Sequence, residues 1–290
     1  MEKTSGWDLH CHTVFSDGTR TPLQLVQEAR ERGLDGAAIT DHDTAAGWTE
    51  AANAAHELGM PLIRGTEMST HWPLGGAKIS VHVLAWLYDP DGRRLAELFA
   101  HTRQRRLERA RTMVANLARD YPISWESVCD QAKESDATTV GRPHMADALV
   151  AAGVYRTRAD AFDGVLSKRG PYYVPVETPT ATEAIRAIKD AGGVAALAHV
   201  GSFARNRVIL SDDQIRACVD CGLDALEVRH RENSPEQRTR LTGLARRWGL
   251  LVTGGSDWHG RGGKPNMLGE NSTDADTVKE IARRGAIPVV

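Results

Sequence analysis

Short histidine-containing motifs at or near the ends of apolar runs are the feature that most constrains the fold of this chain. The motifs hold six of its 11 histidines: His10, His12, His42, His82, His199 and His259. Asp17 and Glu67 follow two apolar runs of the same kind, and Asp257 lies just before the last of these histidines. Histidine is the commonest metal ligand among side chains, and carboxylates are its usual oxygen partners. Motifs far apart in the chain but alike in context therefore predict strand ends that converge on one cluster of metal ions.

Two of these motifs can each hold an ion from a single extended segment. Residues two apart on a strand point to the same face, so His10 and His12 can bind one ion together, and Asp257 and His259 can do the same. A single His-x-His pair occurs often by chance, so the prediction rests on all the motifs taken together. Core histidines that are hydrogen-bonded for stability explain one or two of them, but not the whole set.

The candidate ligands offer nitrogen and oxygen but no sulfur, which favours Mn, Fe or Zn over a soft-metal or purely Mg site. Nine side chains are too many for one ion, but they fit two to three divalent ions, with Mn favoured, if Glu67 bridges them. Clustered ions lower the pKa of bound water towards ~7 and hold the attacking and leaving oxygens of a displacement. Asp17, Glu67 and Asp257 offset only part of the metal charge, so the site should attract a phosphate. The leading hypothesis is a metal-dependent hydrolase.

Composition argues against several other classes of protein. The chain has 290 residues, of which 41% are hydrophobic, enough for a barrel-sized core in one domain. Lysine and arginine number 36 against 38 acidic residues, and the net charge of -2 provides no overall basic field for long duplex nucleic acid. Residues 1–7 lack the apolar core of a signal peptide, and no apolar run reaches the ~20 residues that span a bilayer. We expect a cytoplasmic protein with no membrane contact and no obligate protein partner.

Of the four cysteines, only Cys218 and Cys221 have CxxC spacing. They lie in an expected helix, and no second cysteine pair or histidine pair is nearby in the sequence. Two half-buried helix residues explain them better than a zinc knuckle or a redox pair.

Strand-like and helix-like segments alternate along the chain. The expected strands are 7–13, 36–40, 61–67, 79–88, 194–200, 223–229 and 250–255. The expected helices are 22–32, 48–58, 212–221, 275–284 and one that opens at Ser234 and Pro235. Thr21 and Pro22 open the first helix, and Gly33 ends it. The alternation predicts parallel βαβ units, with the candidate ligands at the C-terminal ends of the strands, where (β/α) barrels place their active sites.

The middle of the chain breaks this alternation. Residues 95–119 are expected to form one long helix, and no convincing strand follows between 121 and 180. We expect residues 1–98 and 181–290 to form the barrel, and residues 99–180 to form an inserted helical subdomain that caps the substrate. The arginines of the long helix favour a solvated face, with a basic rim for phosphates as the alternative. They are Arg103, Arg105, Arg106, Arg109 and Arg111.

As a set, the motifs resemble those of PHP (polymerase and histidinol phosphatase) phosphoesterases. The matching segments are DLHCHTVFSDG, AAITDHDT, GTEMS, VHVLAW, LAHVG and GSDWHG, which run from residue 8 to residue 260. The resemblance implies an α/β fold, a distorted (β/α)7 barrel of the TIM type, with a site for three metal ions.

By the same resemblance, each metal position takes ligands from several motifs. The first takes His10, His12, Glu67 and Asp257, the second Glu67, His82 and His199, and the third Asp17, His42 and His259. Several family members have histidine where this chain has Asp17, so the third position carries extra negative charge here. Glu67, His199 and Asp257 are the side chains expected to serve catalysis.

Two segments of the insertion narrow the resemblance to one branch of the family. The segments GRPHMA at 141–146 and KRGPYY at 168–173 resemble the branch that contains 3′,5′-nucleoside bisphosphate phosphatase and RNase AM. Members of that branch remove the 3′-phosphate of pAp-like nucleotides or trim short RNA from its 5′ end. We expect Arg142 and Lys168 to bind phosphate, since a guanidinium fork and an ammonium group both suit it. His144 is expected to contact phosphate or the leaving oxygen; a helix cap or a surface ion pair is the alternative for these residues.

Four acidic or basic residues near the strand ends are candidates for supporting roles. Asp41 and Asp43 flank His42, and either can orient a ligand histidine through a hydrogen bond. Glu227 and Arg229 end a strand on the catalytic side and are candidates for contacts behind the ligands or with substrate.

The expected reaction is removal of the 3′-phosphate from a nucleoside 3′,5′-bisphosphate, pAp to AMP and phosphate, and also hydrolysis of short 5′-phosphorylated RNA from its 5′ end. One alternative is a histidinol-phosphate phosphatase. A second is an amidohydrolase, which usually needs a bridging carboxylated lysine where this chain has Glu67. The third, of another class, is a non-catalytic, metal-stabilised PHP binding module, although such a module tends to lose ligands and all nine are present here.

Overall fold

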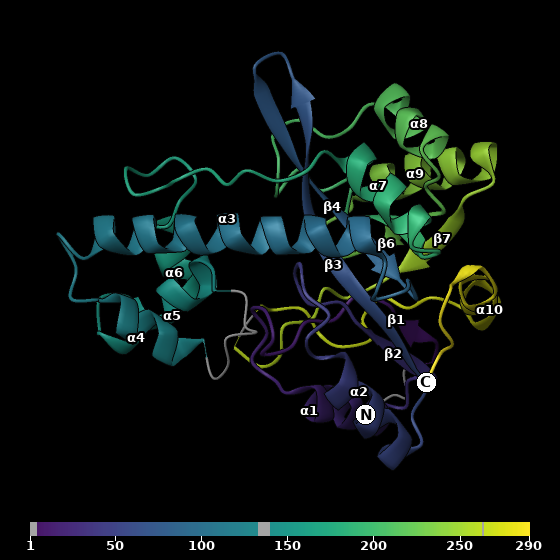
Figure 1. The fold of residues 1–290 in the computed structure, drawn as a ribbon, viewed down its shortest axis with the longest axis horizontal. Coiled ribbons are helices and arrows are strands. Elements are labelled where there is room, and N and C mark those ends of the chain that lie inside the picture. The colour runs from purple at the N-terminus through teal and green to yellow at the C-terminus, as the bar shows by residue number, and fades with distance from the viewer. Residues whose placement is uncertain (1–4, 133–139, 263) are drawn as a thin grey trace.

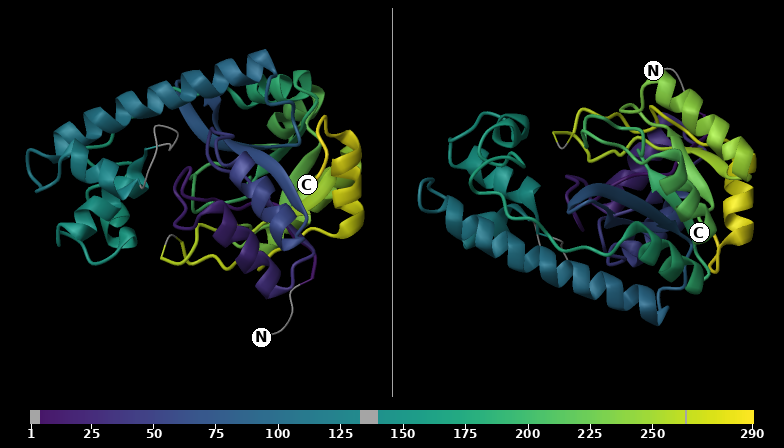
Figure 2. Two further views of the ribbon diagram at one scale, coloured as in Figure 1. Left: turned by 60° about the horizontal axis from the view of Figure 1, so that its bottom comes forward. Right: turned by 90° about the horizontal axis from the view of Figure 1, so that it is seen from above.

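Seven strands form one sheet, in chain order, within the part of the protein that the structure describes. A computed structural model describes residues 5–132, 140–262 and 264–290. The strands are β1 (Trp7–Asp8), β2 (Gly36–Ile39), β3 (Leu62–Leu74), β4 (Ala77–Trp86), β5 (Val194–Ala198), β6 (Ala225–Arg229) and β7 (Leu251–Gly254). The sheet curves into a nearly closed barrel with helices around it, as the views in Figures 1 and 2 show. The α/β barrel expected from the sequence is therefore confirmed.

The alternation of strands and helices had predicted that neighbouring strands are parallel. This is wrong for β4. β4 pairs antiparallel with both β3 and β5, while the other neighbours in the sheet are parallel. β3 runs on past the expected end at Glu67, and β4 returns after a turn at Gly75 and Gly76. Both glycines have positive φ, 50° and 87°, a backbone conformation that glycine adopts without steric cost. A turn this short leaves no crossover helix, so a parallel return is impossible.

The first strand is shorter than the expected 7–13. Regular pairing ends at Asp8, and the following segment pairs instead with the segment after β7. The His12 N–H donates to the Trp258 carbonyl at 2.8 Å, and the Trp258 N–H donates to the His10 carbonyl at 3.2 Å. This bridge joins the first and last strands of the barrel and places two ligand-bearing segments side by side.

Six helices of the described residues lie around the barrel. They are α1 (Pro22–Arg32), α2 (Trp48–Leu58), α7 (Ala181–Asp190), α8 (Asp212–Asp220), α9 (Pro235–Trp248) and α10 (Ala275–Arg284). The predicted ends of α1 are confirmed: the Thr21 side chain accepts a hydrogen bond from the Gln24 N–H, and Gly33 is left-handed with φ 77°. Ser234 caps α9 in the same way.

Two apolar layers hold the barrel together. Alternate strand residues pack into one cluster, for example Ala38, Ile63 and Leu84, while other strand residues pack against the outer helices. Neighbouring positions on one strand belong to different layers because side chains alternate between the two faces. Both layers are buried and mainly apolar.

A long helix, α3 (Arg93–Leu117), leaves the barrel after β4. Three short helices of the described residues lie beside its C-terminal half (Figures 1 and 2). These are α4 (Trp125–Gln131), α5 (Arg142–Ala151) and α6 (Arg158–Asp163). They share an apolar cluster with α3 that includes Met113, Leu117, Val128, Met145 and Leu149. Among the described residues, no helix is long and apolar enough to cross a membrane.

Candidate metal centre

The structure brings all nine side chains singled out in the sequence to one end of the barrel. His10, His12 and Asp17 follow β1, and His42 follows β2. Glu67 and His82 lie within β3 and β4, His199 follows β5, and Asp257 and His259 follow β7. Asp17 and His82 are half-buried, and the other seven are buried. Seven candidate ligands are thus withdrawn from water at one end of the barrel.

Glu67 lies at the middle of the cluster. Its Oε1 is 2.7 Å from His82 Nδ1 and 3.0 Å from His199 Nε2. Its Oε2 lies 3.1–3.3 Å from one ring nitrogen on each of three further histidines: His10, His12 and His42. One carboxylate thus faces five imidazoles, which is the geometry that a bridging ligand requires.

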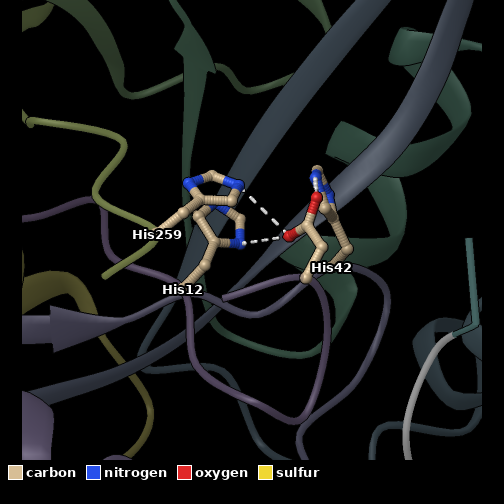
Figure 3. A group of neighbouring side chains, drawn as sticks. His12, His42 and His259 are labelled. Carbon is tan, nitrogen blue, oxygen red and sulfur yellow. Dashed lines mark ion pairs between the residues drawn. The ribbon is translucent and has the colours of Figure 1, made fainter. Parts of the chain in front are cut away.

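Asp17 faces a second group of rings. Its Oδ1 lies 3.1 Å from His259 Nε2 and 3.7 Å from His12 Nδ1, and its Oδ2 lies 3.9 Å from His42 Nε2. Figure 3 shows the rings of these three histidines turned towards one another from separate parts of the chain.

Several of the innermost atoms are buried and make no hydrogen bond to any residue that the structure describes, although carboxylate oxygens lie near them. They are His10 Nε2, His12 Nε2, Asp257 Oδ1 and His259 Nε2. Each such atom costs about 1–3 kcal/mol when nothing replaces its water partners. Asp257 Oδ1 also lies only 3.2 Å from His12 Nε2 and 3.5 Å from His10 Nε2. Lone pairs aimed at a shared point fit a cation, so these residues fit divalent metal ions.

Three sets of ligand atoms lie within 4.8 Å of one another: His12, Asp17, His42 and His259; His10, His12, Glu67 and Asp257; and His42, Glu67 and His82. His199 is outside these sets but contacts Glu67. The sets share His12, His42 and Glu67, so neighbouring ions would share ligands.

The charges of the cluster suit metal binding. Burial raises the pKa of Glu67, but His82, His10 and His42 outweigh it and hold that pKa well below its usual value. Burial lowers the pKa of His42 well below its usual value, and burial with the Lys264 charge lowers that of His259 to about 4. These two rings are neutral at pH 7 and offer a lone pair. Burial also opposes protonation of His12, but Asp257 and Glu67 raise its pKa to about 9, so a metal ion that binds this ring would displace a proton from it.

Glu227 supports the cluster from behind, one of the two roles considered from the sequence. Its Oε1 contacts His10 Nδ1 at 2.9 Å, and its Oε2 accepts the His199 backbone N–H at 2.8 Å. His199 has φ 34°, a conformation that is strained for a residue with a side chain. Arg229 turns away instead and donates to the carbonyls of Ser272 and Val252.

We expect Glu227→Gln to weaken Mn²⁺ binding by ~10–100-fold, the usual effect of losing a partner behind a metal-ligating histidine. Glutamine has one acceptor oxygen, so it cannot serve both His10 and the His199 N–H. Isothermal titration of metal-free protein measures this. Glu236→Gln on the exposed start of α9 is the matched control, and equal affinities for the two variants would contradict the assignment.

Asp41 and Asp43, the two carboxylates that flank His42, bind groups of the surrounding loops. Asp41 accepts hydrogen bonds from the Thr13 N–H and hydroxyl and from Ser16. Asp43 accepts the Ser69 N–H at 2.7 Å and pairs with Arg106 at 2.6 Å. Neighbours on either side of an extended residue point away from it, so both carboxylates brace the surrounding loops instead.

Sequence reasoning missed the cations that hold Asp257. Asp257 Oδ2 pairs with Arg205 at 2.5 Å and with Lys264 at 2.7 Å, which leaves Oδ1 for a metal. Arg205 also pairs with Glu232 at 2.6 Å. The only available signal was their position, soon after His199 and His259 in the chain.

A group of cations lies beside the metal centre on the α3 and α5 side. The Arg142 guanidinium donates to the Leu166 carbonyl at 3.1 Å and lies 5.6 Å from the Tyr173 ring centre, and Arg109 lies 5.1 Å from the same ring. Burial lowers the pKa of Lys168, and the neighbouring charges of Arg142, Arg205 and Arg109 lower it further. The sequence analysis named Arg109 only as one of several arginines on the long helix. In the structure it lies with Arg142 and Lys168. We call these three residues the cation cluster.

No residue of the cation cluster pairs with a carboxylate among the described residues. By contrast, Arg106 and Arg205 each have a carboxylate partner. Cations held close together without counter-charge repel one another, and an anionic ligand relieves that repulsion.

His144, the third substrate contact expected from the sequence, lies in the first turn of α5 and is buried. Its Nδ1 accepts the Gly141 N–H at 3.1 Å, so the ring proton is on Nε2. The capping role weighed as the alternative is therefore present, and among the described residues Nε2 has no hydrogen-bond partner, so it can serve a ligand.

Comparison with known proteins gives consistent matches. The family model described as the PHP domain matches residues 8–136. The 5′-3′ exoribonuclease Rnm of Salmonella typhimurium is 35% identical over 264 residues, covering 87% of this chain and 85% of that protein. The 3′,5′-nucleoside bisphosphate phosphatase of Chromobacterium violaceum is 32% identical, covering 89% of each chain. A phosphoribosyl 1,2-cyclic phosphate 1,2-diphosphodiesterase of Eggerthella lenta is also 32% identical, over 90% of this chain and 97% of that one.

Among solved structures, a protein from Bifidobacterium adolescentis described as a metal-dependent phosphoesterase is 56% identical. It covers 97% of each chain with a TM-score of 0.94. Both the barrel and the helices beside α3 therefore lie within the matched region.

Proposed function

The chain belongs to the PHP family of metal-dependent phosphoesterases, and from that premise we propose that its substrate is a nucleotide with a 5′-phosphate and a phosphoester at the 3′ position. The reaction is removal of the 3′-phosphate from a nucleoside 3′,5′-bisphosphate, pAp to AMP and phosphate. Short RNA with a 5′-phosphate, cut at the first linkage, is a substrate of the same kind.

The cation cluster is the observation that supports this substrate most directly. A nucleoside bisphosphate has two phosphates, and the protein offers two places for anions: the metal centre and the cation cluster. Arginine forms paired hydrogen bonds with phosphate oxygens, and lysine adds a compact charge. Histidinol phosphate carries only one phosphate and an ammonium group, which Arg109, Arg142 and Lys168 would repel. The nucleotide is therefore favoured over that alternative.

We assign the metal ligands as three sets, of which the first two share Glu67. His10, His12, Glu67 and Asp257 hold the first ion, Glu67, His82 and His199 the second, and Asp17, His42 and His259 the third. We propose Mn²⁺ as the native ion, with Fe or Zn as alternatives. When bound, such ions lower the pKa of water and stabilise charge on phosphoryl oxygens.

The protein's own side chains position the reactants. Glu67, His199 and Asp257 would help to hold the ions. Glu227 accepts the His199 N–H and Arg205 pairs with Asp257, so both keep these ligands in place. Arg142 and Lys168 hold the 5′-phosphate, and His144 offers its Nε2–H to the phosphoester or to the departing 3′-oxygen. We propose residues 99–180 as the subdomain that caps the substrate on a barrel made of residues 1–98 and 181–290. Cytoplasmic location and the absence of an obligate protein partner stay predictions.

Incubation of Mn²⁺-loaded protein with pAp should release AMP and phosphate, and pAp should be strongly preferred to 3′-AMP, which lacks the 5′-phosphate. In Arg142→Gln this preference should fall by ~10–100-fold, because one hydrogen-bonded charge contact contributes about 1.5–3 kcal/mol. Kinetic constants for both substrates measure it.

Arg105→Gln, an exposed α3 arginine paired with Glu108, is the matched control and should keep the preference of the unmodified protein. An unchanged preference for pAp in Arg142→Gln would show that Arg142 does not bind the 5′-phosphate. Failure to hydrolyse pAp, 5′-phosphorylated RNA or any other phosphoester with any divalent metal would favour the non-catalytic binding module instead.

A further inference from the structure

A cavity of about 320 Å³ opens between the loop after β1 and the helices α4, α5 and α6. Its walls include Val14 and Thr19 of the loop, His144 and Ala151 of α5, and Arg261 near the end of the chain. The cavity lies within the range of ~300–1,000 Å³ that is typical of small-molecule sites. None of the metal ligands lines it.

The cavity adjoins the metal centre. Gly18, which lines it, is the next residue after Asp17. Arg158, also in the lining, donates to the Asp17 carbonyl at 3.3 Å. His144 is close enough to the Asp17 carboxylate for that charge to act on its pKa, although burial dominates and lowers the pKa. A group attached to a phosphate at the metals can therefore reach the cavity directly.

The cavity and the cation cluster lie on either side of one helical turn. Arg142 and His144 both belong to the first turn of α5. Arg142 turns to the Leu166 carbonyl and the Tyr173 ring, whereas His144 lines the cavity. A phosphate bound by the cation cluster and a group bound in the cavity would thus extend in different directions from the metal centre.

The lining suits a nucleoside. Val14, Val150 and Ala151 present apolar surface, which a base can cover. Arg158 is held by a two-point ion pair with Asp147, so this polar wall is rigid. Arg261 is exposed and pairs with no carboxylate among the described residues. Its positive charge can therefore attract a phosphate at the rim of the cavity.

We propose that this cavity binds the downstream nucleoside of a 5′-phosphorylated oligonucleotide, the one joined through its 5′-oxygen to the phosphate at the metal centre. The inference rests on the proposed function. It adds that the protein has a binding site for the part of an oligonucleotide that follows the cleaved linkage. A bisphosphate such as pAp has no group to place there.

The chemistry is the same for both substrates. A water oxygen bonds to phosphorus, the bond from phosphorus to the 3′-oxygen breaks, and the 3′-oxygen leaves with a proton. From pApA the products are AMP and a second AMP whose 5′-phosphate comes from the cleaved linkage. In a longer chain, that product again carries a 5′-phosphate and can be the next substrate.

Filling the cavity tests the proposal. Ala151→Trp should lower kcat/KM for pApA at least ~10-fold more than it lowers kcat/KM for pAp, since a blocked pocket discriminates by steric exclusion. Ala151→Leu fills less space and should give a smaller loss in the same direction. Ala152→Trp adds the same side chain at the next residue, which is exposed and outside the lining, and should leave the ratio of the two substrates unchanged.

The outcomes separate the two hypotheses. If the unmodified protein hydrolyses pAp and both Ala151 variants lower the two activities equally, the cavity holds some part of the first nucleotide and the inference is wrong. A pApA-specific loss in Ala152→Trp as large as in Ala151→Trp would also overturn it. If the unmodified protein hydrolyses neither substrate, the proposed function itself fails.

Discussion

Replacing Glu67 by glutamine should lower kcat/KM for phosphoester hydrolysis by about 10³-fold or more. Glu67 faces five imidazoles with its two oxygens, and no other carboxylate in the described part of the chain contacts as many. Glutamine has nearly the same shape but one acceptor oxygen and no charge, so it cannot join neighbouring ions. Metal ions supply several kcal/mol of transition-state stabilisation, and each ~1.4 kcal/mol is a factor of ten.

The measurement combines turnover with the metal content of the dialysed protein. We expect Glu67→Gln to keep its fold and to bind fewer ions per chain. Glu97→Gln, in an exposed ion pair with Arg93 on α3, is the control and should retain both metal and activity. If Glu67→Gln kept its full metal content and near-normal turnover, Glu67 would not be a ligand shared between metal ions.

Replacing Arg205 by methionine should destabilise the metal-free protein by about 3 kcal/mol at pH 7. Arg205 pairs with Asp257, whose side chain is 0% exposed, and with Glu232. Removing one partner of a buried ion pair typically costs ~3–5 kcal/mol because a charge is left uncompensated. We expect the lower end of this range, since Lys264 still pairs with Asp257.

The effect should depend on pH in a defined direction. Burial raises the pKa of Asp257, but Lys264 and Arg205 outweigh it and hold that pKa well below its usual value in the folded protein. A carboxyl with a depressed folded-state pKa stabilises the fold above its unfolded pKa of ~3.9, and this contribution is lost as the pH falls further. The difference between Arg205→Met and the unmodified protein should therefore be full at pH 7 and shrink in acid.

Urea unfolding in the presence of chelator measures this difference. Arg216→Met is the control, because Arg216 pairs with Asp220 at a site where both side chains are about half exposed. Exposed pairs contribute only ~0–1 kcal/mol. Equal unfolding free energies for the Arg205 and Arg216 variants would show that Asp257 does not need Arg205.

Local signals in the sequence were sufficient for most of the helices. Helix α1 begins after Thr21 with Pro22 and ends at Gly33, as helix-capping preferences predict. Helix α9 begins in the same way, with Ser234 as its cap and Pro235 as its first residue. These signals act within a few residues, because a cap bonds to backbone groups of the adjacent turn. The order of strands followed from their alternation with helices, but the antiparallel β4 did not. Its direction depends on a turn at Gly75 and Gly76, which lies beyond the end expected for the third strand at Glu67.

The sequence by itself determined which side chains meet at the end of the barrel. Parallel strands bring their C-terminal ends to one edge, so motifs such as those of His10 and His199 had to converge once the strands formed. The tertiary structure decided the contacts behind them. Arg205 on Asp257 and the cation cluster around Tyr173 arise from segments that no periodicity or spacing relates. Such pairs form only when the chain is folded, since a long-range electrostatic contact depends on where side chains end in space and leaves no local pattern to read.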